Sequence, residues 1–208
     1  KTFEEADKNQ LKLKERQNTL MKIVNRDSPQ KIALVCSEGS DLPDKQLVQS
    51  AIACSHPLKL SWLSSLINNG DSWNLPEDFI EQDLILYILP LPLRAADLIW
   101  LEKIPENQPT WIMASINSID NWPESKKELL AQLSNRWINK ILPLHQGEED
   151  LLKLLKPVRR VLEKQNNNID KTRQRLLARL HCMWQADLEQ LRRNKFRSIQ
   201  QRTQWVVA

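Results

Sequence analysis

Hydrophobic positions along this chain form two patterns: short continuous apolar runs, and longer stretches in which apolar residues recur every three or four positions. The short runs, which predict buried strands, cover residues 31–36, 57–63, 83–89, 110–116 and 138–144. The periodic stretches between them predict helices over residues 44–54, 93–103, 123–137 and 148–164. Pro157 should kink or split the last of these helices. Strands that alternate with helices favour right-handed βαβ units, so we expect an α/β fold with a mostly parallel sheet and helices on both faces.

Both ends of the chain predict further helices, over residues 2–26 and 169–205. The second helix carries an apolar stripe at spacings of three and four, formed by Leu177, Leu180, Trp184, Leu188 and Leu191. We interpret Asn166-Asn167-Asn168 as a linker before it. The expected organisation is an N-terminal helix over 1–28, an α/β domain over 29–165 and a long helix over 166–208. A projecting helix with such a stripe would favour self-association.

Charge is concentrated in the last predicted helix. Residues 171–208 contain nine basic and two acidic residues, a net charge of +7, so the rest of the chain, with +4 overall, carries −3. The candidates for a membrane-surface site, which precede or join the apolar end of the chain, are Arg192, Arg193, Lys195, Arg197 and Trp205. A solvated face and nucleic-acid binding are the other two interpretations, and the helix has no nucleic-acid recognition module around it.

The cysteines and histidines exclude several classes of site. Each cysteine lies alone in an apolar or helical stretch, so we expect small buried side chains and a reducing compartment, with no disulfide framework. The histidines lie far apart, without carboxylates at metal-ligand spacing, and no serine stands in a GxSxG elbow. The cysteines are Cys36, Cys54 and Cys182, and the histidines are His56, His145 and His181.

The loop after the first predicted strand stands where a P-loop, GxxxxGK[ST], would wrap phosphate. The residues aligned with its two glycines, its lysine and its hydroxyl are Cys36, Asp41, Leu42 and Pro43. Asp41 would repel phosphate, and Pro43 has neither a hydroxyl nor an N–H. Gly39 and Lys45 remain as candidates for phosphate contact, although Lys45 lies three positions late. An ordinary strand-to-helix connection is therefore favoured over an atypical phosphate loop.

A second candidate site follows the strand over 110–116, where the chain reads Asn117-Ser118-Ile119-Asp120. GTPases use NKxD at this place: the Asn supports the purine ring and the Asp accepts hydrogen bonds from guanine. Asn and Asp are also common turn residues that cap helices, so a structural turn is the competing interpretation. The strand over 57–63 lacks the DxxG that would hold Mg²⁺ and the γ-phosphate, with Ser61 near its end.

Taken together, these segments resemble the second half of an Era-like small GTPase. The resemblance is carried by DLILYILPLPLRAADLIWL, PTWIMASINSID and INKILPLHQGEEDLLKLL. The closing RTQWVVA resembles the junction in a bacterial membrane-associated GTPase-like family, in which a G domain precedes a hydrophobic domain. The resemblance covers roughly residues 30–208. It implies a three-layer P-loop NTPase-like fold that stops before a membrane-associated part.

We therefore expect a non-catalytic pseudo-GTPase: an interaction module without a cofactor, at the cytoplasmic face of a membrane, whose ligand is a protein partner or a second copy. An anionic membrane surface is a further possible partner. The alternative is a GTP-binding protein with Mg²⁺, in which Asn117 and Asp120 read guanine while Gly39 and Lys45 approach phosphate. A second alternative is nucleic-acid binding through the basic helix. The three hypotheses differ in the ligand that they predict.

Overall fold

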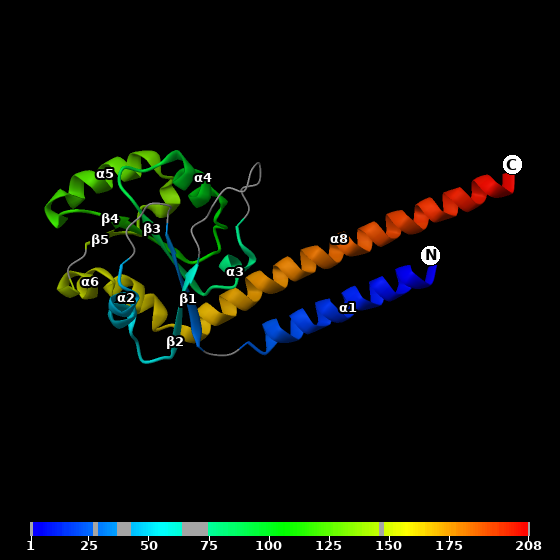
Figure 1. Cartoon of the computed structure of the whole chain (residues 1–208), viewed down its shortest axis with the longest axis horizontal. Coiled ribbons are helices and arrows are strands. Elements are labelled where there is room, and N and C mark those ends of the chain that lie inside the picture. Colours follow the sequence, from blue (N-terminus) through cyan, green and yellow to red (C-terminus); the bar gives the residue numbers. More distant parts are fainter. Residues whose placement is uncertain (1, 27–28, 37–42, 64–74, 146–147, 208) are drawn as a thin grey trace. The chain divides into compact units, whose positions relative to one another are not determined.

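A computed structural model of the chain describes every residue except 1, 27–28, 37–42, 64–74, 146–147 and 208 (Figure 1). The chain divides into two compact units. The α/β unit is Asp27–Thr172. The second unit, here called the helical hairpin, combines Lys1–Arg26 with Arg173–Ala208. The ends of the chain, predicted as separate helical regions, therefore form one unit.

The α/β unit is built on a five-stranded, wholly parallel sheet with strand order β2-β1-β3-β4-β5. Its strands are β1 (Gln30–Cys36), β2 (Leu58–Leu63), β3 (Leu84–Leu89), β4 (Thr110–Ser115) and β5 (Ile141–Leu144). All five strands were predicted. β5 begins three residues later than expected, because residues 138–140 form a turn in which the Lys140 N–H donates to the Trp137 carbonyl at 2.8 Å.

Helices cover both faces of the sheet, which confirms the three-layer α/β fold (Figure 1). One face packs against α2 (Lys45–Ile52), α6 (Glu148–Leu154) and α7 (Lys156–Leu162). The other packs against α3 (Glu77–Ile80), α4 (Ala95–Lys103) and α5 (Trp122–Gln132). Pro157 lies in the first turn of α7, so the predicted split is confirmed.

Two helix predictions need correction. The helix expected over 123–137 ends at Gln132, because Leu133 adopts an extended conformation, and a separate 3₁₀ turn, η2 (Asn135–Trp137), follows. The short helix α3 begins inside the segment predicted as a loop over 68–78. Buried side chains decide both cases, since Phe79 of α3 and Trp137 of η2 are packed into the same core layer.

Alternation along β1 shows how the sheet separates its two core layers. Ile32 and Leu34 pack in the layer with α2, α6 and α7, whereas Ala33 and Val35 pack in the layer with α3, α4 and α5. Every residue of β3 is buried. A strand covered on both faces needs apolar side chains at odd and even positions, which is why these strands read as continuous apolar runs.

The last helix, α8 (Gln165–Val207), begins earlier than predicted, so the linker interpretation of residues 166–168 is wrong. Asn168 is 5% exposed, and its Nδ2 donates to Gln30 Oε1 at 2.9 Å and to the Val161 carbonyl at 2.9 Å. Gln30 Nε2 in turn donates to the Leu162 carbonyl at 2.7 Å. These buried hydrogen bonds fix the start of α8 against β1 and α7, since a buried amide without a partner would be costly.

Within the helical hairpin, α1 (Thr2–Val24) and α8 lie side by side and antiparallel (Figure 1). Arg16 Nη2 lies 3.3 Å from Asp187 Oδ2, and Arg16 Nη1 lies 3.6 Å from the Met183 sulfur. Nearer the base of the hairpin, the Arg173 guanidinium donates to the Arg26 carbonyl. The pairing of two segments more than 140 residues apart was not predicted.

The apolar stripe predicted on α8 changes character along the helix. Leu180 is buried, Trp184 is half-buried, and Leu188 and Leu191 are 57% and 43% exposed. The expectation that all three cysteines are buried is also corrected, because Cys182 is exposed on this helix. The stripe is therefore only partly covered by the hairpin's own side chains.

Candidate functional site

The carboxyl edge of the sheet is the first place to look for a ligand site. Strand order reverses between β1 and β3, and doubly wound folds bind ligands in the crevice beyond that point. The connection from β1 to α2 follows the carboxyl end of β1, and its residues 37–42, with the candidate Gly39, lie outside the described part of the chain. The described residues that follow this segment, from Asp44 onward, show which groups the N-terminus of α2 presents to an anion.

Asp44 caps the N-terminus of α2. Its side-chain oxygen accepts a hydrogen bond from the Gln46 N–H at 2.8 Å. In a phosphate-binding loop, a phosphate oxygen takes this place, because the first N–H groups of a helix are unpaired and the helix dipole favours an anion there. Here a carboxylate supplies both the acceptor and the negative charge. Lys45 is the exposed first residue of the helix.

Asn117 and Asp120 lie together in the turn between β4 and α5, and both are exposed. Ser118 caps the 3₁₀ turn η1 (Ile119–Asn121), with its hydroxyl oxygen accepting from the Asp120 N–H at 3.3 Å. The turn therefore has the local hydrogen bonding of an ordinary helix entry. The structure brings these two candidates together on one loop, while Lys45 is the first residue of α2.

A buried polar network lies beside this edge and was not predicted. Asp97 in the first turn of α4 is 1% exposed. Tyr87 Oη donates to Asp97 Oδ1 at 3.2 Å, and Arg94 Nε donates to Asp97 Oδ2 at 3.0 Å. The sequence signal was an Arg and an Asp three positions apart at the start of a predicted helix, a spacing that lets the two side chains meet.

The chemistry of this network is structural. Burial raises the pKa of Tyr87, and the charge of Asp97 with its hydrogen bond raises it further, so the phenol stays protonated. Both oxygens of Asp97 are engaged by protein donors. The phenol is therefore unsuited to act as a general base at neutral pH, and Asp97 joins Tyr87 to Arg94.

Cys36, at the carboxyl end of β1, is equally unsuited to catalysis. The residue is 8% exposed, and burial raises the pKa of its thiol to about 12. A thiol acts as a nucleophile through its thiolate, which burial in apolar surroundings disfavours. Cys36 therefore packs as a small apolar side chain, as predicted.

Histidine and carboxylate groups form no metal centre in the described chain. His145 Nδ1 lies 3.7 Å from Asp150 Oδ2, with both side chains partly exposed. Within the part of the chain that the structure describes, no group of three or more His, Cys, Asp or Glu side chains is arranged to hold a metal ion.

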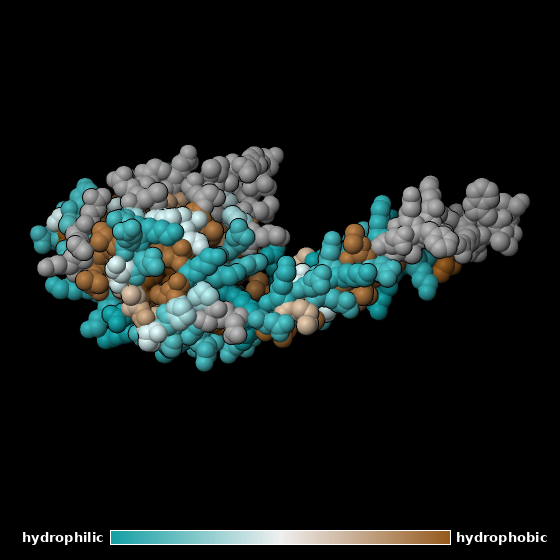
Figure 2. Space-filling model, turned by 60° about the horizontal axis from the view of Figure 1, so that its bottom comes forward, coloured by the Kyte–Doolittle hydropathy of each residue, from teal (hydrophilic) through white to brown (hydrophobic). Residues whose placement is uncertain are grey.

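The helical hairpin carries the second candidate site, a groove of about 560 Å³ between its two helices. Its apolar floor is formed by Leu13, Trp184, Leu188 and Leu191. The polar residues that also line it are Lys8, Asn9, Lys12, Arg16, Asp187, Gln190 and Asn194. Figure 2 shows separate hydrophobic patches on the otherwise hydrophilic surface of the hairpin. The groove was not predicted from the sequence, because it needs both chain ends at once.

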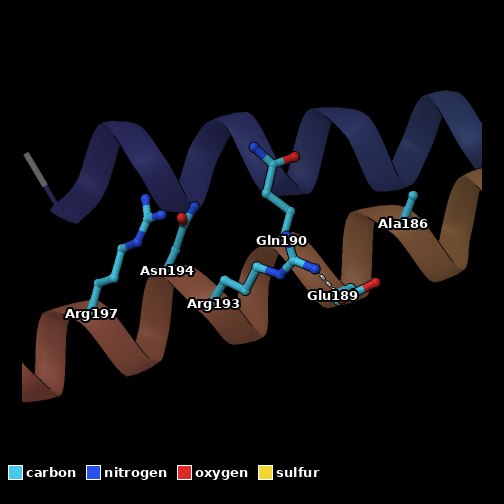
Figure 3. A pocket seen from close by; sticks show the side chains of 6 residues that line it. All are labelled: Ala186, Glu189, Gln190, Arg193, Asn194 and Arg197. Atoms are coloured by element: carbon cyan, nitrogen blue, oxygen red, sulfur yellow. Dashed lines mark hydrogen bonds and ion pairs between the residues drawn. The ribbon is translucent and has the colours of Figure 1, made fainter.

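A polar recess of about 400 Å³ lies on another side of α8, and Figure 3 shows its lining. Arg193 and Glu189 form an ion pair across one turn of the helix. Gln190 and Asn194 line both this recess and the groove, so they occupy the seam between the two helices. At this end, the seam of the hairpin is therefore lined by polar residues.

The four basic candidates for a membrane surface, Arg192, Arg193, Lys195 and Arg197, are all exposed on α8. The side chain of Trp205, the fifth candidate, lies outside the described residues. Among the helices as described, none combines the length and the apolar character needed to cross a membrane. Comparison with protein-family models, with curated proteins and with solved structures gave no match for this chain.

Proposed function

We propose that this chain is a non-catalytic, G-domain-like interaction module, a pseudo-GTPase in which the α/β unit is a scaffold and the helical hairpin presents the binding surface. The observation that carries this proposal is the hydrogen bond from the Gln46 N–H to the Asp44 carboxylate. It occupies the position at which a working phosphate loop would hold its ligand.

Charge around this position supports the proposal. Between the end of β1 and the first residue of α2, the sequence contains Glu38, Asp41 and Asp44 against the single basic residue Lys45. A nucleoside triphosphate is a polyanion, and its site needs donors and cations rather than carboxylates. The carboxylates in this stretch of the sequence would repel it, and Asp44 is placed at the N-terminus of α2.

The fold itself leaves the ligand open. The strand order of this sheet also occurs in flavodoxin-like domains, so a doubly wound sheet does not by itself assign a nucleotide. The proposal of a pseudo-GTPase therefore rests on the residues at the carboxyl edge and on the resemblance of the segments around them.

A GTP-binding role is the second candidate, and one observation favours it. Asn117 and Asp120 are exposed on one turn directly after β4, where a base-reading pair would stand. In that role Asp120 would accept hydrogen bonds from guanine, while Gly39 and Lys45 would approach the phosphates.

The proposed module acts beside a membrane-associated region, as the resemblance implies. Exposed Arg192, Arg193, Lys195 and Arg197 on α8 support this placement, since basic residues near an anionic leaflet contribute roughly 1 kcal/mol each. The same residues would bind nucleic acid only through phosphate contacts, with a strong dependence on salt.

Calorimetric titration of the full chain with GTP and Mg²⁺, with ATP as a control, tests the proposal. At a protein concentration near 100 µM, absence of heat would exclude affinities better than roughly millimolar and support the pseudo-GTPase. Guanine-selective binding in the micromolar range would overturn it. Asp120→Ala should then abolish binding, and Glu124→Ala, an exposed carboxylate on α5, should leave it unchanged.

A further inference from the structure

We infer that the groove of the helical hairpin is a docking site for an acidic amphipathic helix of a partner protein. This inference deepens the proposed function and rests on its interaction role, for which it names the surface and the class of partner. The groove and its lining residues all belong to the hairpin.

The floor of the groove has the spacing that accepts a helix. Trp184, Leu188 and Leu191 follow one another at intervals of four and three residues along α8, and Leu13 contributes from α1. A helix docks in such a groove by placing its own apolar residues at i, i+3 or i+4, and i+7. From Trp184 to Leu191 the floor extends about 10 Å at 1.5 Å per residue, which matches two turns of an occupant.

Three leucines of the floor are exposed in the chain as a whole. Leu13 is 59% exposed, Leu188 57% and Leu191 43%. Neighbouring apolar side chains exposed to this extent mark an interaction surface more often than a free surface. Gln190 and Asn194, which line the seam beside this floor, are polar. An occupant would therefore supply apolar contact to the floor that these two residues do not supply.

Charge around the groove selects an acidic occupant. Lys8 and Lys12 line it from α1 and form no ion pair with any carboxylate whose side chain is described. Among the described residues that line it, Asp187 is the one acidic residue, and it is already paired with Arg16 at 3.3 Å. Arg192 and Lys195 lie one helical turn beyond Leu188 and Leu191 respectively, and both are exposed, so cations also flank the floor on α8.

The total charge of the hairpin disfavours a second hairpin as the occupant. Its 15 Lys and Arg residues and six Asp and Glu residues give +9, and since the whole chain carries +4, the α/β unit carries −5. A second hairpin would bring the same +9 to the interface. Like charges brought together oppose association, whereas opposite charges accelerate docking. A helix with glutamates beside its apolar face complements the groove in both respects.

Fluorescence anisotropy with the full chain and a labelled synthetic peptide tests the inference. The peptide has about three heptads, with leucine at the a and d positions and glutamate at the flanking positions. A matched peptide carries lysine in place of glutamate. We expect the glutamate peptide to bind saturably and at least about tenfold more tightly than the lysine peptide.

Two pairs of variants locate the binding. Leu188→Gln with Leu191→Gln removes the apolar floor without changing charge and should weaken binding by about tenfold or more. Leu11→Gln is the control, since Leu11 is 59% exposed on α1 but does not line the groove. Lys8→Gln with Lys12→Gln should weaken binding several-fold and reduce its salt dependence, whereas Lys14→Gln, outside the groove, should not.

Several results would overturn the inference. Equal binding of the two peptides would show that charge does not select the occupant. Equal effects of Leu11→Gln and of the Leu188 and Leu191 double variant would show that the peptide does not bind in the groove. The surface would be assigned to a membrane if the wild type bound neither peptide but bound phosphatidylserine–phosphatidylcholine vesicles, and if the double variant lost that vesicle binding. A dimer in sedimentation that the double variant dissociates would assign it to a second copy. GTP binding alone would overturn the pseudo-GTPase proposal and leave the peptide result standing.

Discussion

The α/β unit and the helical hairpin differ in how far their apolar side chains are buried. In the α/β unit, β3 is buried along its whole length and both core layers are closed by helices. In the hairpin, α1 and α8 leave several large apolar side chains exposed. Of the twelve large apolar residues that are exposed in the described chain, eight belong to the hairpin: Leu11, Leu13, Met21, Val24, Leu188, Leu191, Phe196 and Ile199.

This difference separates a unit that is stable through its own core from one whose surface is suited to a partner. Apolar area removed from water contributes about 25 cal/mol per Å², so side chains left exposed contribute little until something covers them. The charges divide along the same boundary, with an acidic α/β unit and a basic hairpin. The site that sequence motifs point to lies on the first unit, and the exposed surface lies on the second.

Truncation of one leucine in each unit should sharpen this comparison most. Leu86 in β3 is fully buried, so Leu86→Ala should lower the free energy of unfolding by about 2–5 kcal/mol through lost burial and a residual cavity. Leu188→Ala should change it by less than about 0.5 kcal/mol, because Leu188 is already 57% exposed. Urea unfolding followed by circular dichroism measures both. A loss above about 2 kcal/mol at Leu188 would mean that the chain already covers this residue in solution.

The buried network beside the carboxyl edge should give the next largest effect. Asp97→Ala leaves the Tyr87 hydroxyl without its acceptor in a buried layer, so the free energy of unfolding should fall by about 1–3 kcal/mol. Tyr87→Phe removes the hydroxyl that donates this hydrogen bond and should lower the free energy of unfolding by less than Asp97→Ala does. In a double-mutant cycle, Asp97→Ala should be less harmful when it is combined with Tyr87→Phe than when it is made alone. Additive effects in urea unfolding would contradict the coupling.

Alkaline pH should destabilise the α/β unit through Cys36. Its thiol has an ordinary pKa of 9.0, and burial raises this to about 12 in the folded chain. The folded state therefore keeps a proton that the unfolded state loses, so this contribution to stability is complete below pH 9.0 and declines above it. The decline is about 1.4 kcal/mol per pH unit. Tyr87 adds to it in the same direction above its ordinary pKa of 10.0.

Urea midpoints between about pH 8 and pH 10.5 measure this decline, a window that spans the unfolded pKa of the thiol. Cys36→Ala should flatten the curve, because it removes one titrating group whose pKa differs between the two states. Cys182→Ala is the matched control, since Cys182 is exposed on α8 and should leave the slope unchanged. Identical slopes for both variants would show that Cys36 is not the group responsible.

The strands and most helices were predictable because each is specified locally. Continuous apolar runs marked β1 to β5, and Pro157 marked the division between α6 and α7. The prediction of a linker over the three asparagines, residues 166–168, was wrong because the structure of this segment is not specified locally. Its composition indicates a linker, but Asn168 is fixed by hydrogen bonds to Gln30 and to the Val161 carbonyl, residues that only the folded unit brings near.

The candidate sites divide in the same way. Absence of a phosphate motif could be read from Asp41 and Pro43 in the sequence, and the cap formed by Asp44 follows the usual preference for Asp before a helix. The groove could not be predicted, because Leu13 and Leu188 meet only when the two ends of the chain pair. Contacts of such long sequence separation have no local signature.

The ion pair between Arg16 and Asp187 should give the smallest effect and tests that pairing directly. Its side chains are 24% and 32% exposed, and partly solvated pairs of this kind contribute at most about 1 kcal/mol. Arg16→Gln and Asp187→Asn should each lower hairpin stability by about 0.5 kcal/mol, and the double variant should lose little more. Hydrogen exchange of α1 amides at low and high salt measures this, since screening should remove the difference between variants. If both single variants exchange like the wild type at low salt, α1 and α8 do not pair through these residues, and the groove that they enclose would lose one of its walls.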